Sequence, residues 1–258
     1  MVERKLLFIC EGDIDEPNFI NRLMEKCFSS CKYEIYSYRT TIHTLASVLK
    51  NDYSDFADGD TELKLILREL EPNPHKKALL SEQFTDTILA FDFEPHHDHP
   101  DFDMVRKMLA YYTDSTDMGK LYINYPMMQS YKHFRSLPDP TFLSREASPI
   151  GYKDLVGRES CFTDLAKYDY RTFISIAVHN LYKAWKILKY GKQRQTPEEF
   201  EHIDWIAIFD NEMEKFRISQ KVDVLNILSF FVIDYNPSTF FREISKHPEK
   251  YDFIPEIQ

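Results

Sequence analysis

The chain has 258 residues, of which 43% are hydrophobic and 29% are charged, so it is long enough to bury a substantial core and has an ordinary globular composition. Its formal net charge of −10 excludes nucleic-acid binding by bulk attraction, because that attraction needs Lys and Arg against phosphates. A nucleic-acid ligand would need a local basic patch, a bound divalent metal or a basic partner. No signal peptide and no run of membrane-spanning length is visible, so we expect a soluble, cytoplasmic protein without membrane contact.

The first 135 residues alternate between predicted strands and predicted helices. Short apolar and β-branched runs predict strands, and apolar residues at helical spacing predict helices. Strands are predicted over Leu6–Cys10, Tyr33–Arg39, Thr85–Phe93 and Lys120–Tyr125. Helices are predicted after Pro17 and over Leu45–Leu49, Glu62–Leu70 and Asp103–Tyr112, with a helix breaker at 71–75. This alternation predicts an α/β domain over 1–135, with a mainly parallel sheet flanked by helices.

Residues 136–258 change character and are predicted to form a mostly helical accessory domain. Residues 136–165 contain three prolines and are predicted to be a partly irregular connection. Helices are predicted over Tyr170–Tyr190, from Pro197 to Arg217 and over Val222–Ile233. The last segment is apolar throughout, so we expect it to be core, with a partner-binding face as the alternative if it is exposed.

Four cysteines stand at positions 10, 27, 31 and 161 and are predicted to be free buried thiols of a reducing compartment. The spacing of Cys27 and Cys31 would also suit a metal. No second pair of Cys or His residues lies near them in the sequence, so free thiols are the favoured interpretation.

Acidic residues directly follow two of the predicted strands. Glu11 ends the apolar run of LLFICEGDIDE, and Asp92 and Glu94 end the strand of TDTILAFDFE. Ligands of open α/β sheets bind beyond the carboxyl ends of the strands, so we expect the Glu11 and Asp92 side chains within about 8 Å of each other, with Glu94 in the same crevice. Converging carboxylates repel one another unless they bind a hard cation such as Mg²⁺ or Mn²⁺. The pattern therefore predicts a metal-assisted reaction or proton transfer by Glu11.

The same residues resemble the motifs of the Toprim superfamily, named for topoisomerases and primases. FICEG followed by acids, and ILAFDFE further on, are similar to the Glu-Gly and Asp-x-Asp motifs of that family. CEGDIDEPNF resembles the opening of its stand-alone RloB-like and OLD-like phage-defence members, and INYPMMQSYKHF resembles a later stretch of that group. The resemblance covers about residues 5–135 and implies a Toprim-like fold.

The resemblance also implies roles for individual residues. Glu11 would transfer protons, and Asp92 and Glu94 would hold Mg²⁺, while Glu16 matches a second acid of the RloB-like opening. Two positions depart from the family pattern. Glu94 replaces the second Asp, which keeps the charge and lengthens the side chain, and Gln129 stands where the later stretch of the family has Glu.

The function that the resemblance implies is a metal-dependent nuclease, an antiviral defence effector that acts on DNA or RNA. A separate ATPase would control it, because this chain contains no GxxxxGK[ST] motif. The alternative is a non-catalytic, Toprim-like regulator or trigger subunit of a defence complex. Assembly into a homo-oligomer is left open.

Several further residues are candidates for the metal or for phosphate. The loop PHHDHPDFD could bind Zn²⁺ or Mn²⁺ through its histidines, although a solvated loop is favoured. Asp98 is its first candidate for the acidic site, and His96 and His97 could instead contact a phosphate. Phosphate or nucleic acid could also be bound by Lys132 and His133 and, on a basic helix, by Lys186 and Lys189. The alternative for these four is a solvent-exposed helix surface.

Overall fold

The computed structural model describes residues 4–53, 56, 62–190, 203–247 and 250. Contacts divide the chain into two compact units, which we name the sheet unit, residues 1–24 and 28–123, and the helical unit, residues 25–27 and 124–258. The division falls near residue 123, whereas the sequence places the boundary after residue 135. In the part of the chain that the structure describes, no helix is both long and apolar enough to cross a bilayer.

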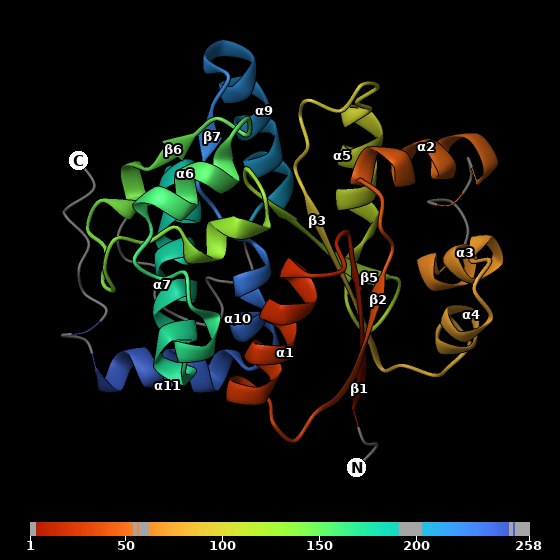
Figure 1. Ribbon diagram of the computed structural model, residues 1–258, viewed down its shortest axis with the longest axis horizontal. Helices are drawn as coiled ribbons and strands as arrows, with labels where there is room; N and C mark the ends of the chain where they lie inside the picture. The colour runs from red at the N-terminus through yellow and green to blue at the C-terminus, as the bar shows by residue number, and fades with distance from the viewer. Residues whose placement is uncertain (1–3, 54–55, 57–61, 191–202, 248–249, 251–258) are drawn as a thin grey trace. The chain divides into compact units, whose positions relative to one another are not determined.

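A five-stranded sheet in the order β2-β1-β3-β5-β4 organises the sheet unit (Figure 1). β1 pairs in parallel with both β2 and β3, while β4 pairs antiparallel with β5. The strands are β1 (Lys5–Cys10), β2 (Lys32–Ser37), β3 (Asp86–Asp92), β4 (Thr113–Asp114) and β5 (Gly119–Asn124). The mostly parallel sheet confirms the predicted α/β class.

Helices cover both faces of this sheet. α1 lies on one face, and α2 and α5, which pack against each other, lie on the other (Figure 1). The helices of the unit are α1 (Asp15–Cys27), α2 (Ile42–Asp52), α3 (Leu63–Leu70), α4 (Pro74–Leu80) and α5 (Phe102–Tyr111). This double cover explains why Leu6–Cys10 is apolar without alternation: every one of its side chains is fully buried.

α4 corrects the prediction of a helix breaker at 71–75. The side chain of Asn73 accepts hydrogen bonds from the backbone N–H groups of His75 and Lys76, and Pro74 occupies the first turn. Proline is well suited to that position, because its missing N–H would have no intrahelical partner there. The same residues that would interrupt a helix therefore begin one.

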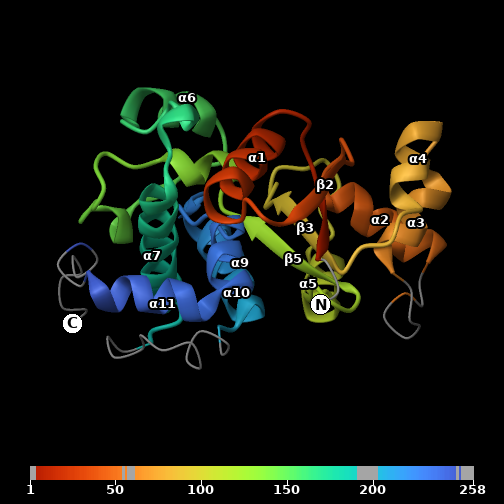
Figure 2. The ribbon, with the colours of Figure 1, turned by 90° about the horizontal axis from the view of Figure 1, so that it is seen from below.

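The helical unit is built around α7, which packs against α9 and α10 (Figure 2). Its α-helices are α6 (Tyr152–Glu159), α7 (Tyr170–Ile187), α9 (Trp205–Ser219), α10 (Phe231–Tyr235) and α11 (Pro237–Lys246). Short 3-10 helices and a two-stranded sheet complete it: η1 (Met128–Lys132), η2 (Phe142–Ser144), η3 (Leu165–Lys167), η4 (Leu228–Phe230), β6 (Glu146–Ala147) and β7 (Val222–Asp223). The helical character predicted for this half is confirmed. α6 lies within the stretch predicted to be irregular, and the predicted helix start at Pro197 lies outside the described residues.

The prediction of one helix over Val222–Ile233 is wrong, although the predicted burial is confirmed. This segment starts as β7 and becomes helical only at η4 and α10. Asn226 lies between β7 and η4. Its backbone N–H donates to Oδ1 of Asn180 at 2.7 Å, and its Nδ2 donates to Oδ1 of Asn124 at 3.1 Å. Buried polar groups need such partners, and here they come from outside the segment rather than from a regular helix.

A buried ionic cluster joins α7, α9 and β7. Lys183 is fully buried and contacts Asp223 at 2.6 Å, while the backbone N–H of Asp223 donates to Glu212 at 2.8 Å. Lys183 also donates to the carbonyls of Phe142, Leu143 and Arg145. Burial, followed by the charge of Asp223, raises the pKa of Glu212 to about 8. The cluster is thus fully satisfied by contacts inside the helical unit.

Candidate metal site

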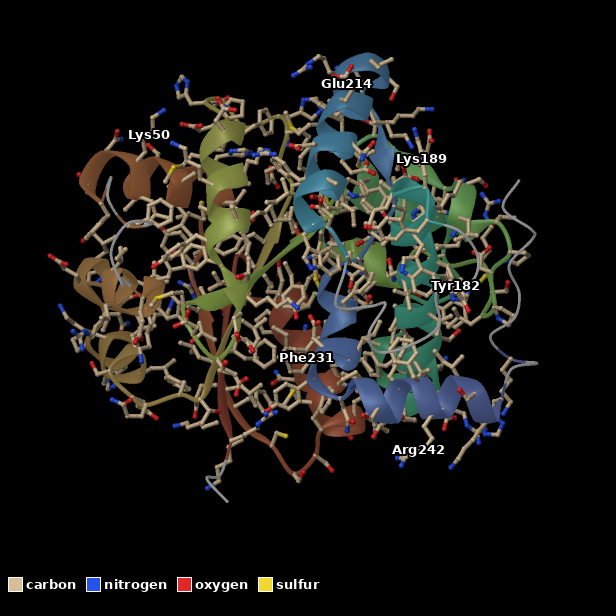
Figure 3. The ribbon with its side chains drawn as sticks, turned by 180° about the vertical axis from the view of Figure 1, so that it is seen from behind. Lys50, Tyr182, Lys189, Glu214, Phe231 and Arg242 are labelled. Carbon is tan, nitrogen blue, oxygen red and sulfur yellow. The ribbon has the colours of Figure 1, made fainter. Side chains whose placement is uncertain are left out.

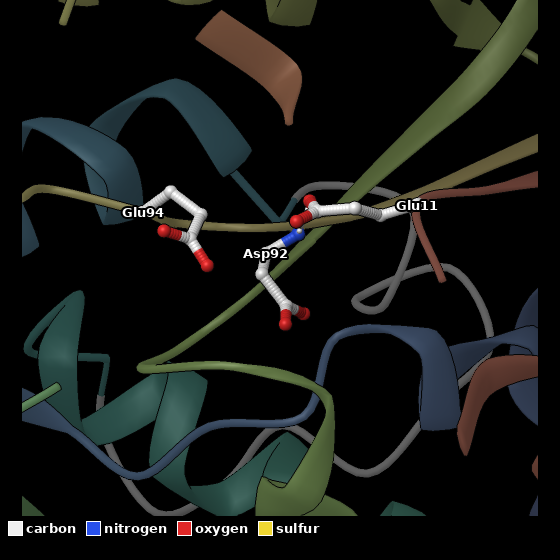
Figure 4. Close-up of side chains that lie close together, drawn as sticks. All are labelled: Glu11, Asp92 and Glu94. Carbon is white, nitrogen blue, oxygen red and sulfur yellow. Dashed lines mark hydrogen bonds between the residues drawn. The ribbon is translucent and has the colours of Figure 1, made fainter. Parts of the chain in front are cut away.

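The three carboxylates predicted to converge do so at the ends of β1 and β3. Glu11, Asp92 and Glu94 each offer one oxygen, and these three oxygens lie within 4.8 Å of one another. Figure 4 shows the three side chains gathered at this edge of the sheet. The separation expected from the sequence is therefore met. Among the described residues, these are the acids, histidines or cysteines grouped closely enough to share an ion.

Strand order explains why these residues meet. β1 lies between β2 and β3, and its connection to β2 runs through α1 on one face, whereas the chain leaves β3 towards α5 on the opposite face (Figure 1). Where adjacent strands send their connections to opposite faces, a crevice opens beyond their carboxyl ends. Glu11 follows β1 and Asp92 ends β3, so both lie at the carboxyl-end edge of these two strands.

Backbone hydrogen bonds hold Glu11 against β3. Its own N–H donates to the carbonyl of Ala90 at 3.2 Å, and its Oε2 accepts a hydrogen bond from the N–H of Asp92 at 3.2 Å. The Asp92 side chain is only 7% exposed, and its Oδ1 is shielded from solvent. The two carboxylates are therefore oriented by the sheet itself rather than by flexible loops.

Glu94 joins Glu11 and Asp92 through an unusual turn. Its φ of +45° lies in the left-handed region, which costs a residue with a Cβ about 1–2 kcal/mol. The Glu94 carbonyl accepts a hydrogen bond from the N–H of His97 at 3.2 Å, which closes the turn. Figure 4 shows the Glu94 carboxylate directed towards Asp92. Backbone strain of this kind is concentrated at ligand sites.

The spacing of the carboxylates fits a hard divalent cation. Mg²⁺ binds oxygen at about 2.0–2.1 Å in octahedral geometry, so ligand oxygens around it are separated by about 3–4 Å. Oxygens within 4.8 Å of one another need only small side-chain movements, or a bridging water, to share one ion. Acidic groups of this kind fit Mg²⁺ or Mn²⁺ better than a soft metal, because all of the ligands are carboxylate oxygens.

Glu16 is not one of the three grouped carboxylates. It is 5% exposed in the first turn of α1, and a Cβ on Gly12 would come within 2.5 Å of its Oε2. The pKa of Cys10 is raised to about 12, first by burial and then by the charge of Glu16. Gly12 thus lets a buried carboxylate pack against the loop that follows β1.

His43 is a residue of this region that the sequence did not single out. It is 1% exposed, its Nδ1 accepts a hydrogen bond from the N–H of Asp101 at 3.2 Å, and its ring lies 5.4 Å from that of His97. Burial lowers its pKa to about 4, and the nearby carbonyls of Phe93 and Glu94 oppose that shift only in part. His43 is therefore neutral at physiological pH, and because Nδ1 accepts, its proton lies on Nε2 beside the Glu94 turn. In the sequence His43 stands two residues before the predicted helix Leu45–Leu49, and the structure places it inside α2, so no local pattern pointed to it.

The histidine-rich loop does not join the carboxylate group. Asp98 and His96 are exposed, and His97 is half-buried against His43. None of the three belongs to the set of oxygens within 4.8 Å. Cys27 and Cys31 are half-buried free thiols outside that set too, Cys161 is exposed, and Cys10 alone of the four is buried.

The predicted phosphate-binding residues belong to the helical unit. His133 is buried, with its Nδ1 3.0 Å from the hydroxyl of Tyr152, so it supports the fold and does not face a surface ligand. The Lys132 ammonium lies over the ring of Tyr131, and Lys186 donates to a backbone carbonyl at 2.9 Å. Lys189 is exposed at one end of α7 (Figure 3). Gln129, at the departure from the family pattern, is 4% exposed.

No protein-family model, curated protein or solved structure matches this chain. The similarity to Toprim and RloB-like proteins therefore depends on the sequence motifs alone.

Proposed function

We propose that this protein is a metal-dependent nuclease that cleaves phosphodiester bonds of DNA or RNA. The observation that carries the proposal is the group of three carboxylate oxygens within 4.8 Å at the carboxyl ends of β1 and β3. Mg²⁺ or Mn²⁺ bound there would polarise a phosphoryl oxygen and lower the pKa of a bound water. Asp92 and Glu94 are its ligands, with Glu11 beside them.

Glu11 is the proton-transfer group of this proposal. Its Oε2 accepts a hydrogen bond from the N–H of Asp92, and the residue is half-buried, so it is oriented and still partly exposed to solvent. A general acid or base must be positioned within hydrogen-bond reach of the proton that it moves. The buried and strained neighbours, Asp92 and Glu94, are better suited to holding an ion in place.

The biological setting follows from the motifs. The RloB-like opening around Glu11 supports a role as a defence effector controlled by a separate ATPase, with nucleic acid as the substrate. A second candidate function is a non-catalytic regulator or trigger subunit built on the same scaffold. It is favoured by Gln129, a buried amide where the family stretch has a carboxylate.

Cleavage assays on Glu11→Gln separate these two functions. We expect loss of cleavage of supercoiled DNA, single-stranded DNA or tRNA by about 10²–10⁴, because the amide cannot transfer the proton. Asp92→Asn should fail differently and be partly rescued by more metal or by Mn²⁺. Asp98→Asn, an exposed acid of the same region, is the matched control.

If the isolated chain shows no cleavage, the assays are repeated with the ATPase partner present. If Glu11→Gln leaves both cleavage and cellular toxicity beside that partner unchanged, Glu11 is not catalytic. The regulator function would then replace the nuclease.

A further inference from the structure

Arg39 follows β2 and is bound through its backbone to Glu11, although 28 positions separate them in the chain. β1 and β2 pair in parallel with Cys10 opposite Ser37, and the pairing continues beyond both strands. The N–H of Arg39 donates to the carbonyl of Glu11 at 2.8 Å. Neighbouring strands are about 4.8 Å apart, a gap that an arginine side chain easily crosses. The Arg39 side chain therefore starts from the backbone position next to Glu11, and its guanidinium lies at Asp13, two residues further along the same loop.

The backbone of Arg39 is held in a costly conformation. Its φ of +68° is in the left-handed region, where a residue with a Cβ loses about 1–2 kcal/mol. The hydrogen bond to Glu11 maintains this conformation at the point where the chain leaves β2 for α2. Glycine would adopt it without strain, so the strain itself does not explain an arginine here. A role for the Arg39 side chain would explain an arginine at this position.

The guanidinium of Arg39 is available to a ligand. It is 63% exposed, and its Nη2 lies 3.1 Å from Oδ2 of Asp13, which is itself 50% exposed. An exposed pair of this kind contributes about 0–1 kcal/mol, so an anion can displace Asp13 at little cost. Guanidinium offers five N–H donors in a planar fork that matches two oxygens of a phosphate.

The net charge of the three carboxylates and one divalent ion favours a cation such as Arg39 near a bound phosphate. Three carboxylates repel an incoming phosphodiester, and one divalent ion leaves one of their negative charges uncompensated. A guanidinium that exchanges Asp13 for a phosphate bound at this group would offset that remaining charge. It also supplies the local positive group that a chain of net charge −10 needs in order to hold a phosphate.

We propose that Arg39 binds the non-bridging oxygens of a nucleic-acid phosphodiester beside the carboxylate group, after exchanging Asp13 for the phosphate. This inference rests on the proposed nuclease function and adds a phosphate-binding residue from β2 to it. Asp13 acts as a weak internal competitor for the same guanidinium. Lys50 offers a matched control, since it is a surface cation on α2 that is 62% exposed and paired with one carboxylate, Asp101 (Figure 3).

The test measures binding of a fluorescein-labelled single-stranded oligothymidylate by anisotropy with Mn²⁺. The full chain carries no background substitution, because Glu11 belongs to the carboxylate group, and a denaturing gel after each titration verifies that the probe is intact. Arg39→Gln should weaken binding about 10- to 100-fold and reduce the slope against salt by about one phosphate contact. Arg39→Lys should be intermediate, because it keeps the charge and loses the fork. Asp13→Asn should tighten binding up to about 5-fold, and Lys50→Gln should leave it unchanged.

Mn²⁺-induced thermal stabilisation, measured on the same proteins, separates this inference from the proposed function. Arg39→Gln should keep the full stabilisation. Unchanged oligonucleotide affinity in Arg39→Gln, with the stabilisation intact, overturns the role of Arg39 alone. Loss of the stabilisation in Arg39→Gln overturns it too, since Arg39 would then support the metal site. A parent chain that shows no Asp92-dependent Mn²⁺ response contradicts the proposed function, and one that shows the response without binding the probe overturns the inference.

Discussion

Replacing Asp92 by Asn should make the metal-free protein more stable and its response to metal smaller. Asparagine keeps the size of the side chain and removes one of the three charges that meet at the ends of β1 and β3. The higher stability without metal and the smaller stabilisation by metal have the same cause. Both follow from a carboxylate that repels its neighbours until a cation is bound.

The expected size follows from the distances. Two unit charges 4.8 Å apart repel by about 3 kcal/mol at an effective dielectric constant of about 20, and by about 1 kcal/mol in bulk water. Glu11 and Glu94 are half-buried, so solvent screens part of the repulsion, and we expect Asp92→Asn to add about 1–2 kcal/mol to the free energy of unfolding. For a chain of this length that is about 2–8 °C in melting temperature.

Stabilisation by metal favours the parent over Asp92→Asn, opposite to the effect expected without metal. With a dissociation constant of about 1 mM, about 10 mM Mg²⁺ stabilises the parent by about 1.4 kcal/mol, or about 3–6 °C. A tenfold weaker site in Asp92→Asn retains about 0.4 kcal/mol of this. The variant should therefore melt above the parent in a chelator, and the difference should shrink or reverse in Mg²⁺.

Scanning calorimetry in chelator, Mg²⁺ and Mn²⁺, with ionic strength matched by NaCl, measures both effects. Asp98→Asn is the control, since it removes one acidic charge outside the carboxylate group. Equal metal shifts in the parent, Asp92→Asn and Asp98→Asn would refute the reasoning, because the cation would then act on general surface charge. Lower stability of Asp92→Asn in chelator would refute the repulsion argument.

Three further substitutions test other parts of the structure. Burial raises the pKa of Glu212 to about 8, so the folded protein keeps a proton that the unfolded chain loses above pH 4.5. The free energy of unfolding should therefore fall as the pH rises from 4.5 to about 8. Urea unfolding of Glu212→Gln should show a flatter pH profile. Lys183→Met should lower the free energy of unfolding by about 3 kcal/mol, because it leaves Asp223 buried with less compensation, and a loss below about 1 kcal/mol would contradict this. Gly12→Ala should cost about 1–3 kcal/mol, since its Cβ would meet the buried Glu16 carboxylate, and a prior Glu16→Ala change should remove most of that cost in a double-mutant cycle.

Local patterns of hydrophobicity and charge predicted the central strands and the acids that follow them. The predicted strand Leu6–Cys10 differs from β1 by one residue, and Thr85–Phe93 differs from β3 by one residue at each end. Both are apolar runs bounded by charge, which a buried parallel strand requires irrespective of its neighbours. Because ligands of α/β sheets bind at strand carboxyl ends, the placement of Glu11 and Asp92 followed from the same pattern.

Other elements depended on contacts that the pattern does not contain. The segment Val222–Ile233 is as apolar as a buried helix, yet Asn226 inside it pairs with Asn124 and Asn180, far away in the chain. Apolar composition predicts burial well and says little about backbone conformation inside a core. His133 was likewise placed on a surface by its basic neighbours, but its contact with Tyr152 lies in the interior.

The sequence by itself determined the fold class and the acids of the candidate site, because burial and strand ends leave a local pattern in hydrophobicity and charge. Only the tertiary structure decided which residues accompany those acids. The order of strands in the sheet makes Arg39 a neighbour of Glu11, and the packing of α2 against α5 brings His43 to Asp101. Pairing across a sheet and packing between helices join residues distant in the chain, and periodicity along a single segment holds no information about such partners.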